Sequence, residues 1–196
     1  MYNYYVFYKP YLTLCQFSPE GDKRTLAHYL PGMPKDVYPV GRLDYDSEGL
    51  LILTDDKTLT ELLLTPRHGH RRTYYVQVEG EITLDALTQL REGIIITIDG
   101  KPYRTKKALT EILFEEPPLP PRDPPIRFRK SVPTTWLSLT LTEGKNRQVR
   151  RMTAAAGFPT LRLVRFAMGT VTINGMEPGT YKHFGPEIKQ LLARGK

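Results

Sequence analysis

The sequence predicts a mixed fold in which β-strands outnumber short helices. Apolar runs rich in Val, Ile, Tyr and Phe recur along the chain, at lengths typical of strands. Only a few segments have helical periodicity behind a capping residue. Asp99-Gly100 stands between two apolar runs and is typical of a tight hairpin turn. Together these signals indicate a sheet with a few covering helices.

The elements follow in order along the chain. We expect strands over residues 3–8, 50–54, 73–79, 94–98, 101–105, 107–114 and 135–142. Residues 25–30 are compatible with a short helix. Asp56 and Thr83 are suitable N-caps for two further helices, which run through Leu64 and Arg91.

The run from Val40 to Leu51 is the most informative motif. Pro39 and Gly41 disfavour a helix, so we expect an extended segment in which Arg42 and Asp44 share one face. A carboxylate beside a guanidinium stays ionised and keeps a fixed direction. This arrangement suits a nucleophile or a base, and it equally describes an ordinary surface ion pair.

The same stretch resembles a calcium-binding loop. Asp44, Asp46, Glu48, Gly49 and Asp55 fall close to the EF-hand pattern. The segment before the motif is not helical, and Asp55 stands where that loop requires a bidentate Glu. The sequence therefore disfavours a calcium site, and it predicts no metal site elsewhere.

Composition narrows the functional class. The chain has 196 residues, a formal net charge of +7 and a pI near 9.4, which favours an anionic partner such as nucleic acid or a membrane surface. Cys15 is the only cysteine, so an intramolecular disulfide is impossible, and we expect a buried thiol. We recognise no signal peptide and no apolar stretch of membrane-spanning length, so we expect a cytoplasmic protein.

Residues 115–133 form a Pro-rich, basic segment. Its prolines exclude regular structure, and it contains Arg127, Arg129 and Lys130. It is either a linker between domains or a basic insertion loop that could touch RNA. The strand expected immediately afterwards favours the loop.

A basic stretch follows the last predicted strand. It opens a helix with Asn146 as a fair N-cap and Gly157 as the terminating residue. Arg147 and Arg151 lie four residues apart on one face of this helix, and a phosphate would relieve their repulsion. Tyr74, in the strand over residues 73–79, could stack on a base or simply pack in the sheet.

These motifs together resemble the pseudouridine synthases. The segment 41–54 is similar to their catalytic motif, and 144–152 is similar to the third motif of the branch named for small-subunit uridine synthase A. The Pro-rich segment is similar to the large-subunit synthase E subgroup. The resemblance implies an α+β fold with a mixed, mainly antiparallel sheet, flanking helices and a central cleft between two lobes. It also implies one catalytic domain over residues 1–196, without the S4-type N-terminal module.

The resemblance implies roles for individual residues. Asp44 would be the essential aspartate, Arg150 would pair with it, Tyr74 would stack on the flipped uracil, and Leu163 would line the pocket. Arg42 would help hold the displaced base or the RNA backbone. The enzyme would isomerise a uridine of 23S ribosomal RNA as a monomer, without a cofactor.

Further cations are expected to contact RNA phosphates. They are Lys145, Arg147, Arg151, Arg71, Arg72, Arg127, Arg129 and Lys130. Arg72 stands where the family usually has lysine, which keeps the charge but not lysine-specific contacts. Two rival functions remain: a glycosidase using Asp44 with Asp46 or Glu48, and an RNA-binding protein without catalytic activity.

Overall fold

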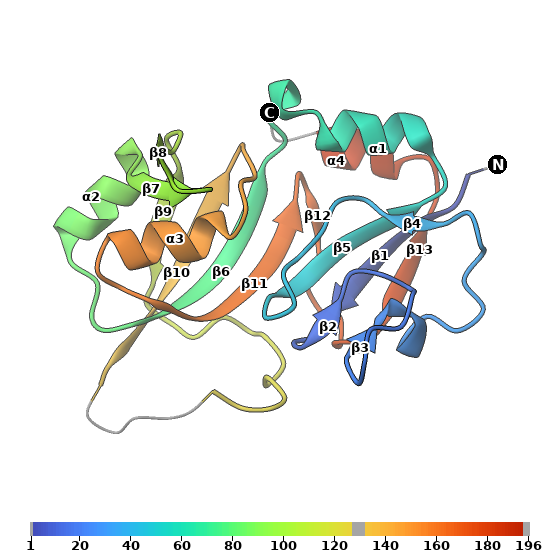
Figure 1. Cartoon of the computed structure of the whole chain (residues 1–196), viewed down its shortest axis with the longest axis horizontal. Coiled ribbons are helices and arrows are strands. Elements are labelled where there is room, and N and C mark those ends of the chain that lie inside the picture. Colours follow the sequence, from blue (N-terminus) through green and yellow to red (C-terminus); the bar gives the residue numbers. More distant parts are fainter. Residues whose placement is uncertain (1, 127–131, 194–196) are drawn as a thin grey trace. The chain divides into compact units, whose positions relative to one another are not determined.

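The computed structural model describes residues 2–126 and 132–193, which form two compact units (Figure 1). Unit 1 comprises the residues up to His70 and those from Val164 onward. Unit 2 comprises Arg71–Leu163. Within the described residues, no helix is long and apolar enough to cross a membrane.

In the sheet of unit 1, every residue of the strand β5 is buried. β1 (Tyr4–Lys9) pairs antiparallel with β13 (Tyr181–Phe184) and with β5 (Glu48–Thr54). β11 (Thr160–Met168) enters the unit at Val164 and pairs parallel with β5. The remaining short elements of the unit are β2 (Thr13–Leu14), β3 (Arg24–Thr25), η1 (Leu26–His28), β4 (Tyr38–Pro39), η2 (Pro66–His68) and β12 (Val171–Thr172).

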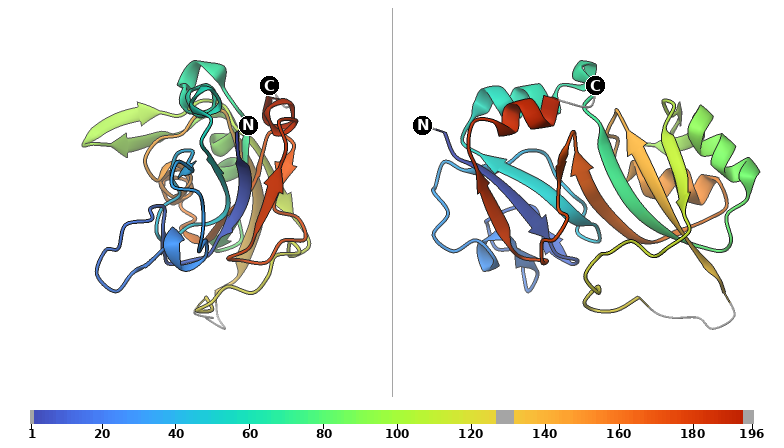
Figure 2. Two further views of the ribbon diagram at one scale, coloured as in Figure 1. Left: turned by 90° about the vertical axis from the view of Figure 1, so that its right-hand side faces the viewer. Right: turned by 180° about the vertical axis from the view of Figure 1, so that it is seen from behind.

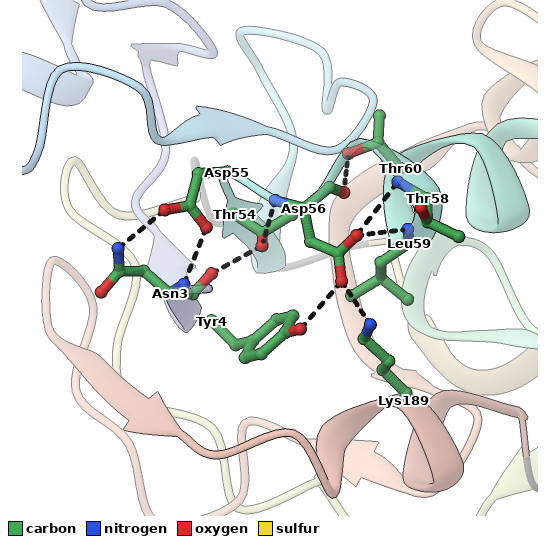
Figure 3. Close-up of polar contacts among 9 residues, drawn as sticks. All are labelled: Asn3, Tyr4, Thr54, Asp55, Asp56, Thr58, Leu59, Thr60 and Lys189. Atoms are coloured by element: carbon green, nitrogen blue, oxygen red, sulfur yellow. Dashed lines mark hydrogen bonds and ion pairs between the residues drawn. The ribbon is translucent and has the colours of Figure 1, made fainter. Parts of the chain in front are cut away.

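A polar cluster fixes the junction between β5 and α1 (Lys57–Leu64) (Figure 3). Asp56 is the predicted N-cap and accepts hydrogen bonds from the amides of Thr58 and Leu59, at 3.0 and 3.2 Å. Its second oxygen accepts from the Tyr4 hydroxyl at 2.8 Å and from Lys189 on α4 (Ile188–Ala193) at 2.5 Å. Burial alone would raise the pKa of Asp56, but these donors lower it.

Unit 2 is a three-stranded antiparallel sheet with two helices over one face. β6 (Arg72–Glu79), β10 (Thr134–Leu141) and β9 (Leu109–Leu113) lie side by side in that order. Buried side chains from these strands pack with α2 (Leu84–Glu92) and α3 (Gln148–Ala155) in one core cluster. Figure 1 shows both helices beside these strands.

A separate hairpin projects from unit 2 (Figure 2, left). It consists of β7 (Ile95–Ile98) and β8 (Lys101–Arg104), joined by Asp99-Gly100. Both turn residues have positive φ, 49° and 76°, as the predicted tight turn requires. The mixed, mainly antiparallel sheet with flanking helices is thereby confirmed, since β5–β11 is a parallel pair whereas β1–β13, β1–β5, β6–β10 and β9–β10 are antiparallel.

Candidate active site

Asp44 lies on a turn that leads into β5, and not on a strand. Gly41 adopts a φ of 73°, which ends the extended conformation, and strand structure resumes only at Glu48. The amide of Ser47 donates to the carbonyl oxygen of Asp44 at 3.0 Å, closing the turn. The prediction that Arg42 and Asp44 lie on a strand is therefore wrong. Arg42 is exposed, whereas Asp44 is half-buried.

The rival glycosidase interpretation relied on the same alternation. It placed Asp44, Asp46 and Glu48 on one strand face, but Asp46 belongs to the turn and only Glu48 belongs to β5. Glu48 is 2% exposed, in contrast to the half-buried Asp44 and Asp46. The geometric argument for that rival is lost with the strand.

The residue before Asp44 is held by the single cysteine. The amide of Leu43 donates to the Cys15 sulfur at 3.2 Å, and the Cys15 thiol donates to the Leu43 carbonyl oxygen at 3.4 Å. Both residues are buried, as expected for Cys15. The thiol therefore satisfies two buried backbone groups immediately before Asp44.

Lys9 is a fully buried cation beside the same turn. Its ammonium group donates to the carbonyl oxygens of Thr13 and Pro10 at 2.7 and 2.9 Å. Burial lowers the pKa of Lys9 to about 8, although the nearby Cys15, Glu48, Asp46 and Asp44 oppose this shift. A positive charge at this position would stabilise the ionised carboxylates of the turn. Residues 41–48 are named the acidic turn below.

Gly49 has a structural explanation that replaces the calcium-loop interpretation. A Cβ at Gly49 would stand 2.3 Å from the carbonyl oxygen of Arg165, so only glycine permits β5 and β11 to approach this closely. Asp55 accepts two hydrogen bonds from Asn3, at 2.7 and 2.8 Å. Among the described residues, no cluster of three or more His, Cys, Asp or Glu side chains could hold a metal ion.

Two predicted pocket residues are associated with the same apolar cluster of unit 2. Tyr74 packs against the apolar cluster that contains Leu163, which is 5% exposed. Arg150, on α3, is half-buried and donates to the carbonyl oxygen of Thr160 at 3.5 Å. Tyr74, Arg150 and Leu163 therefore belong to unit 2, whereas Asp44 belongs to unit 1.

The basic stretch before α3 forms a turn with an unexpected cap. Arg147, and not the predicted Asn146, occupies the N-cap position, in the left-handed conformation with φ 50°. The carbonyl and side-chain oxygens of Asn146 instead accept hydrogen bonds from Arg151, at 3.1 and 3.2 Å. Arg147 and Arg151 thus do not share a helical face, because Arg147 lies outside the helix. Gly157 terminates α3 as predicted, with φ 91°.

The buried residues Glu143 and Gln148 hold this turn through hydrogen bonds. The Gln148 side chain accepts from the amide of Lys145 at 2.9 Å and donates to Glu143 at 2.7 Å. Lys145 and Arg147 are exposed, whereas Glu143 is 6% exposed. Residues 143–148 are named the basic turn below.

The other predicted phosphate contacts have different positions. Arg71 is exposed, and the half-buried Arg72 places its guanidinium beside Gly144 of the basic turn. Arg127, Arg129 and Lys130 lie outside the described residues.

Sequence reasoning assigned no positioning role to Lys9, Cys15 or Glu143. Lys9 directly follows the strand predicted over residues 3–8 and is the last residue of β1, and this was the available signal for it. His70 is likewise buried, with 3% exposure, and its Nε2 lies 3.1 Å from the carbonyl oxygen of Leu62.

The sequence and fold of the chain match those of known proteins. A family model described as RNA pseudouridylate synthase matches residues 3–155. The chain belongs to this family. It is therefore an isomerase, and the resemblance derived from the motifs is confirmed.

Relatives of known name support the subgroup. The chain is 53% identical, over 172 residues, to ribosomal large subunit pseudouridine synthase E of Xanthomonas axonopodis pv. citri, covering 87% of each chain. It is 49% identical to the protein of that name from Vibrio parahaemolyticus, covering 90% of this chain and 71% of that protein. A solved pseudouridylate synthase aligns with a TM-score of 0.79 at 25% identity, covering 98% of this chain and 74% of the other.

Proposed function

We propose that this enzyme isomerises a specific uridine of 23S ribosomal RNA to pseudouridine without a cofactor, with Asp44 as its catalytic carboxylate. The observation that carries the proposal is the position of Asp44, on a turn held by the Cys15 thiol and lying beside the buried Lys9. The similarity to proteins named ribosomal large subunit pseudouridine synthase E supports the substrate. The proposal includes action as a monomer in the cytoplasm, as one catalytic domain over residues 1–196.

The reaction needs one anionic group near the sugar. The bond between N1 and C1′ breaks, the uracil turns, C5 bonds to C1′, and the C5 proton leaves while N1 gains one. Substrate and product are isomers, so neither oxidant nor reductant is consumed. An ionised carboxylate can attack C1′, add to the base or remove the C2′ proton, and each route requires Asp44 to be an anion.

The remaining residues would bind and orient the nucleotide. Tyr74 stacks on the flipped uracil, Leu163 lines the apolar wall, and Arg150 pairs with Asp44. Arg42 holds the position left by the base or the adjoining RNA backbone. Base flipping costs a few kcal/mol, which contacts to phosphates offset. These contacts come from Lys145, Arg147, Arg151, Arg71, Arg72, Arg127, Arg129 and Lys130.

The decisive experiment measures tritium release from 5-tritiated uridine in unmodified 23S ribosomal RNA. Asp44→Asn should lower the rate by about a thousandfold or more, because the neutral amide cannot replace the carboxylate. Asp46→Asn is the matched control from the same turn, and it should keep the rate within about tenfold. Undiminished release by Asp44→Asn, or none by the wild type, overturns the proposal. Free uracil as product would indicate a hydrolase.

Arg150 is tested by separating catalysis from affinity. Arg150→Ala should lower kcat far more than it weakens RNA binding, because its partner is Asp44 and not a phosphate. Equal losses in kcat and in RNA affinity would identify Arg150 as a phosphate contact instead.

A further inference from the structure

The hairpin β7–β8 and the basic turn both carry exposed cations. Lys101, the first residue of β8, and Lys106, two residues after the end of that strand, are exposed. In the basic turn, Lys145 and Arg147 are exposed. Lys107 differs, because its ammonium group pairs with Glu92 at 2.7 Å and its charge is thereby offset.

Buried Glu143 joins these two segments. One carboxylate oxygen accepts from the Tyr103 hydroxyl on β8, at 2.5 Å. The other accepts from the amide of Lys106 at 2.9 Å and from the Gln148 side chain at 2.7 Å. The hydrogen bond to Glu143, together with burial, raises the pKa of Tyr103 to about 12. A single carboxylate thus fixes the end of the hairpin against the start of α3.

Further contacts hold the same two segments together. The Arg151 guanidinium donates to the carbonyl oxygen of Thr97 on β7 and to Asn146 of the basic turn. The Lys145 ammonium group stands 4.9 Å from the centre of the Tyr103 ring. These hydrogen bonds therefore hold the backbone segments that carry the cations of the hairpin and of the turn in one fixed arrangement. Rigid placement reduces the ordering cost of binding.

We propose that β7–β8 and the basic turn form one contact surface for the RNA backbone, built within unit 2, whereas the proposed catalytic carboxylate belongs to unit 1. The proposal rests on the proposed function and adds Lys101 and Lys106 to the phosphate contacts, with Glu143 as the residue that positions them. Cations on two adjoining segments match an extended polyanion, and the exposed Asn146 adds a polar group between them. The partner is the backbone of the substrate RNA outside the target nucleotide.

The test compares a double variant with a matched control. Lys101→Ala/Lys106→Ala should raise KM for 23S ribosomal RNA by about tenfold and leave kcat within twofold. The slope of log affinity against log salt concentration should also become less steep by about 1 to 2, because each lost phosphate contact reduces the slope by a little under one unit. Lys57→Ala/Lys107→Ala removes one exposed lysine of unit 1 and the paired lysine beside Lys106, and it should change KM less than twofold.

Glu143 is tested by its effect on the same surface. Glu143→Gln should raise KM by about threefold or more with kcat within twofold, because the cations lose their common frame. Glu143→Asp, which keeps the charge, should recover part of this loss, whereas a merely structural role predicts no such rescue. Circular dichroism at the assay temperature verifies that each variant is folded.

The outcomes separate this inference from the proposed function. If the Lys101→Ala/Lys106→Ala variant has an unchanged KM and salt dependence, the proposed RNA-contact surface is wrong. The same conclusion follows if the control variant raises KM equally. Failure of the wild type to release tritium overturns the proposed function instead. The RNA affinities of the variants still test the surface in that event, because binding precedes chemistry.

Discussion

The acidic turn and the basic turn are built on the same plan with opposite charges. In unit 1, the carboxylates of Asp44 and Asp46 are half-buried near Lys9, which has 0% exposure. In unit 2, the exposed cations of the basic turn surround Glu143, which is 6% exposed. A buried group of opposite charge therefore accompanies each turn: Lys9 lies near the acidic turn, and Glu143 is the first residue of the basic turn. Neither turn relies on regular secondary structure to hold its functional side chains.

The two buried charges, Glu143 and Lys9, differ in the number of hydrogen bonds that they form. Glu143 accepts three hydrogen bonds, from Tyr103 on β8, from the amide of Lys106 and from Gln148 at the start of α3. Lys9 donates to two carbonyl oxygens and remains strongly desolvated, so its pKa falls to about 8. The comparison indicates that Glu143 is a structural anchor, whereas Lys9 also sets the electrostatic environment of the acidic turn.

The largest expected effect is that of removing the buried cation. Lys9→Met should lower the free energy of unfolding by about 3 kcal/mol, because two buried carbonyl oxygens lose their donor and the carboxylates lose a neighbouring cation. It should also lower kcat, through the acidic turn. Urea unfolding and tritium release measure the two effects. Lys182→Met, at an exposed position in β13, is the control and should be nearly neutral. A loss below about 1 kcal/mol would contradict the comparison.

At alkaline pH, Lys9 and Tyr103 should change the free energy of unfolding in opposite directions, because their pKa values are shifted in opposite directions. Between about pH 8 and 10.5 the unfolded chain holds the Lys9 proton more tightly than the folded chain, so stability rises with pH by up to about 3 kcal/mol. Tyr103 has its pKa raised from 10.0 to about 12, so the folded chain retains that proton longer. Its contribution is complete below pH 10 and is lost as pH rises towards 12.

Urea titrations at several pH values check this prediction by difference. Subtracting the stability of Lys9→Met from that of the wild type isolates the rise between pH 8 and 10.5. Subtracting that of Tyr103→Phe isolates the fall above pH 10. If both differences change with pH in the same direction, the pKa values of Lys9 and Tyr103 are not shifted in opposite directions.

Local sequence signals predicted the main strands and helices up to α3, left β11, β13 and α4 unassigned, and failed at both turns. Asp56 satisfied the backbone donors of α1 as its position suggested, and Asp99-Gly100 formed its turn, because these outcomes depend on neighbouring residues alone. The acidic turn was mistaken for a strand because Lys9 and Cys15, which contact or adjoin it, are distant in sequence. The cap of α3 was misassigned to Asn146 for a different, local reason, since that side chain accepts a hydrogen bond from Arg151. Asp44 was predicted by motif, and its pairing with Arg150 stays a prediction.

A smaller effect is expected at Cys15. Cys15→Ala leaves the buried amide and carbonyl of Leu43 without the thiol and should cost about 2 kcal/mol in the free energy of unfolding. The backbone before Asp44 should also lose its fixed position, so kcat should fall while KM for RNA stays nearly constant. Cys15→Ser keeps a donor and an acceptor and should recover part of kcat. A loss of stability with unchanged kcat would limit the thiol to a packing role.

The smallest expected effect belongs to the Tyr103 hydroxyl. Tyr103→Phe removes one of three donors to Glu143 and keeps the ring beneath Lys145, so the free energy of unfolding should fall by about 1 kcal/mol at pH 7. RNA affinity should fall about twofold or less, because the amide of Lys106 and Gln148 still hold the carboxylate. Fluorescence anisotropy with a 23S ribosomal RNA fragment measures this affinity. A loss as large as that of Glu143→Gln would show that Tyr103, and not the carboxylate, is the main link between the hairpin and the basic turn.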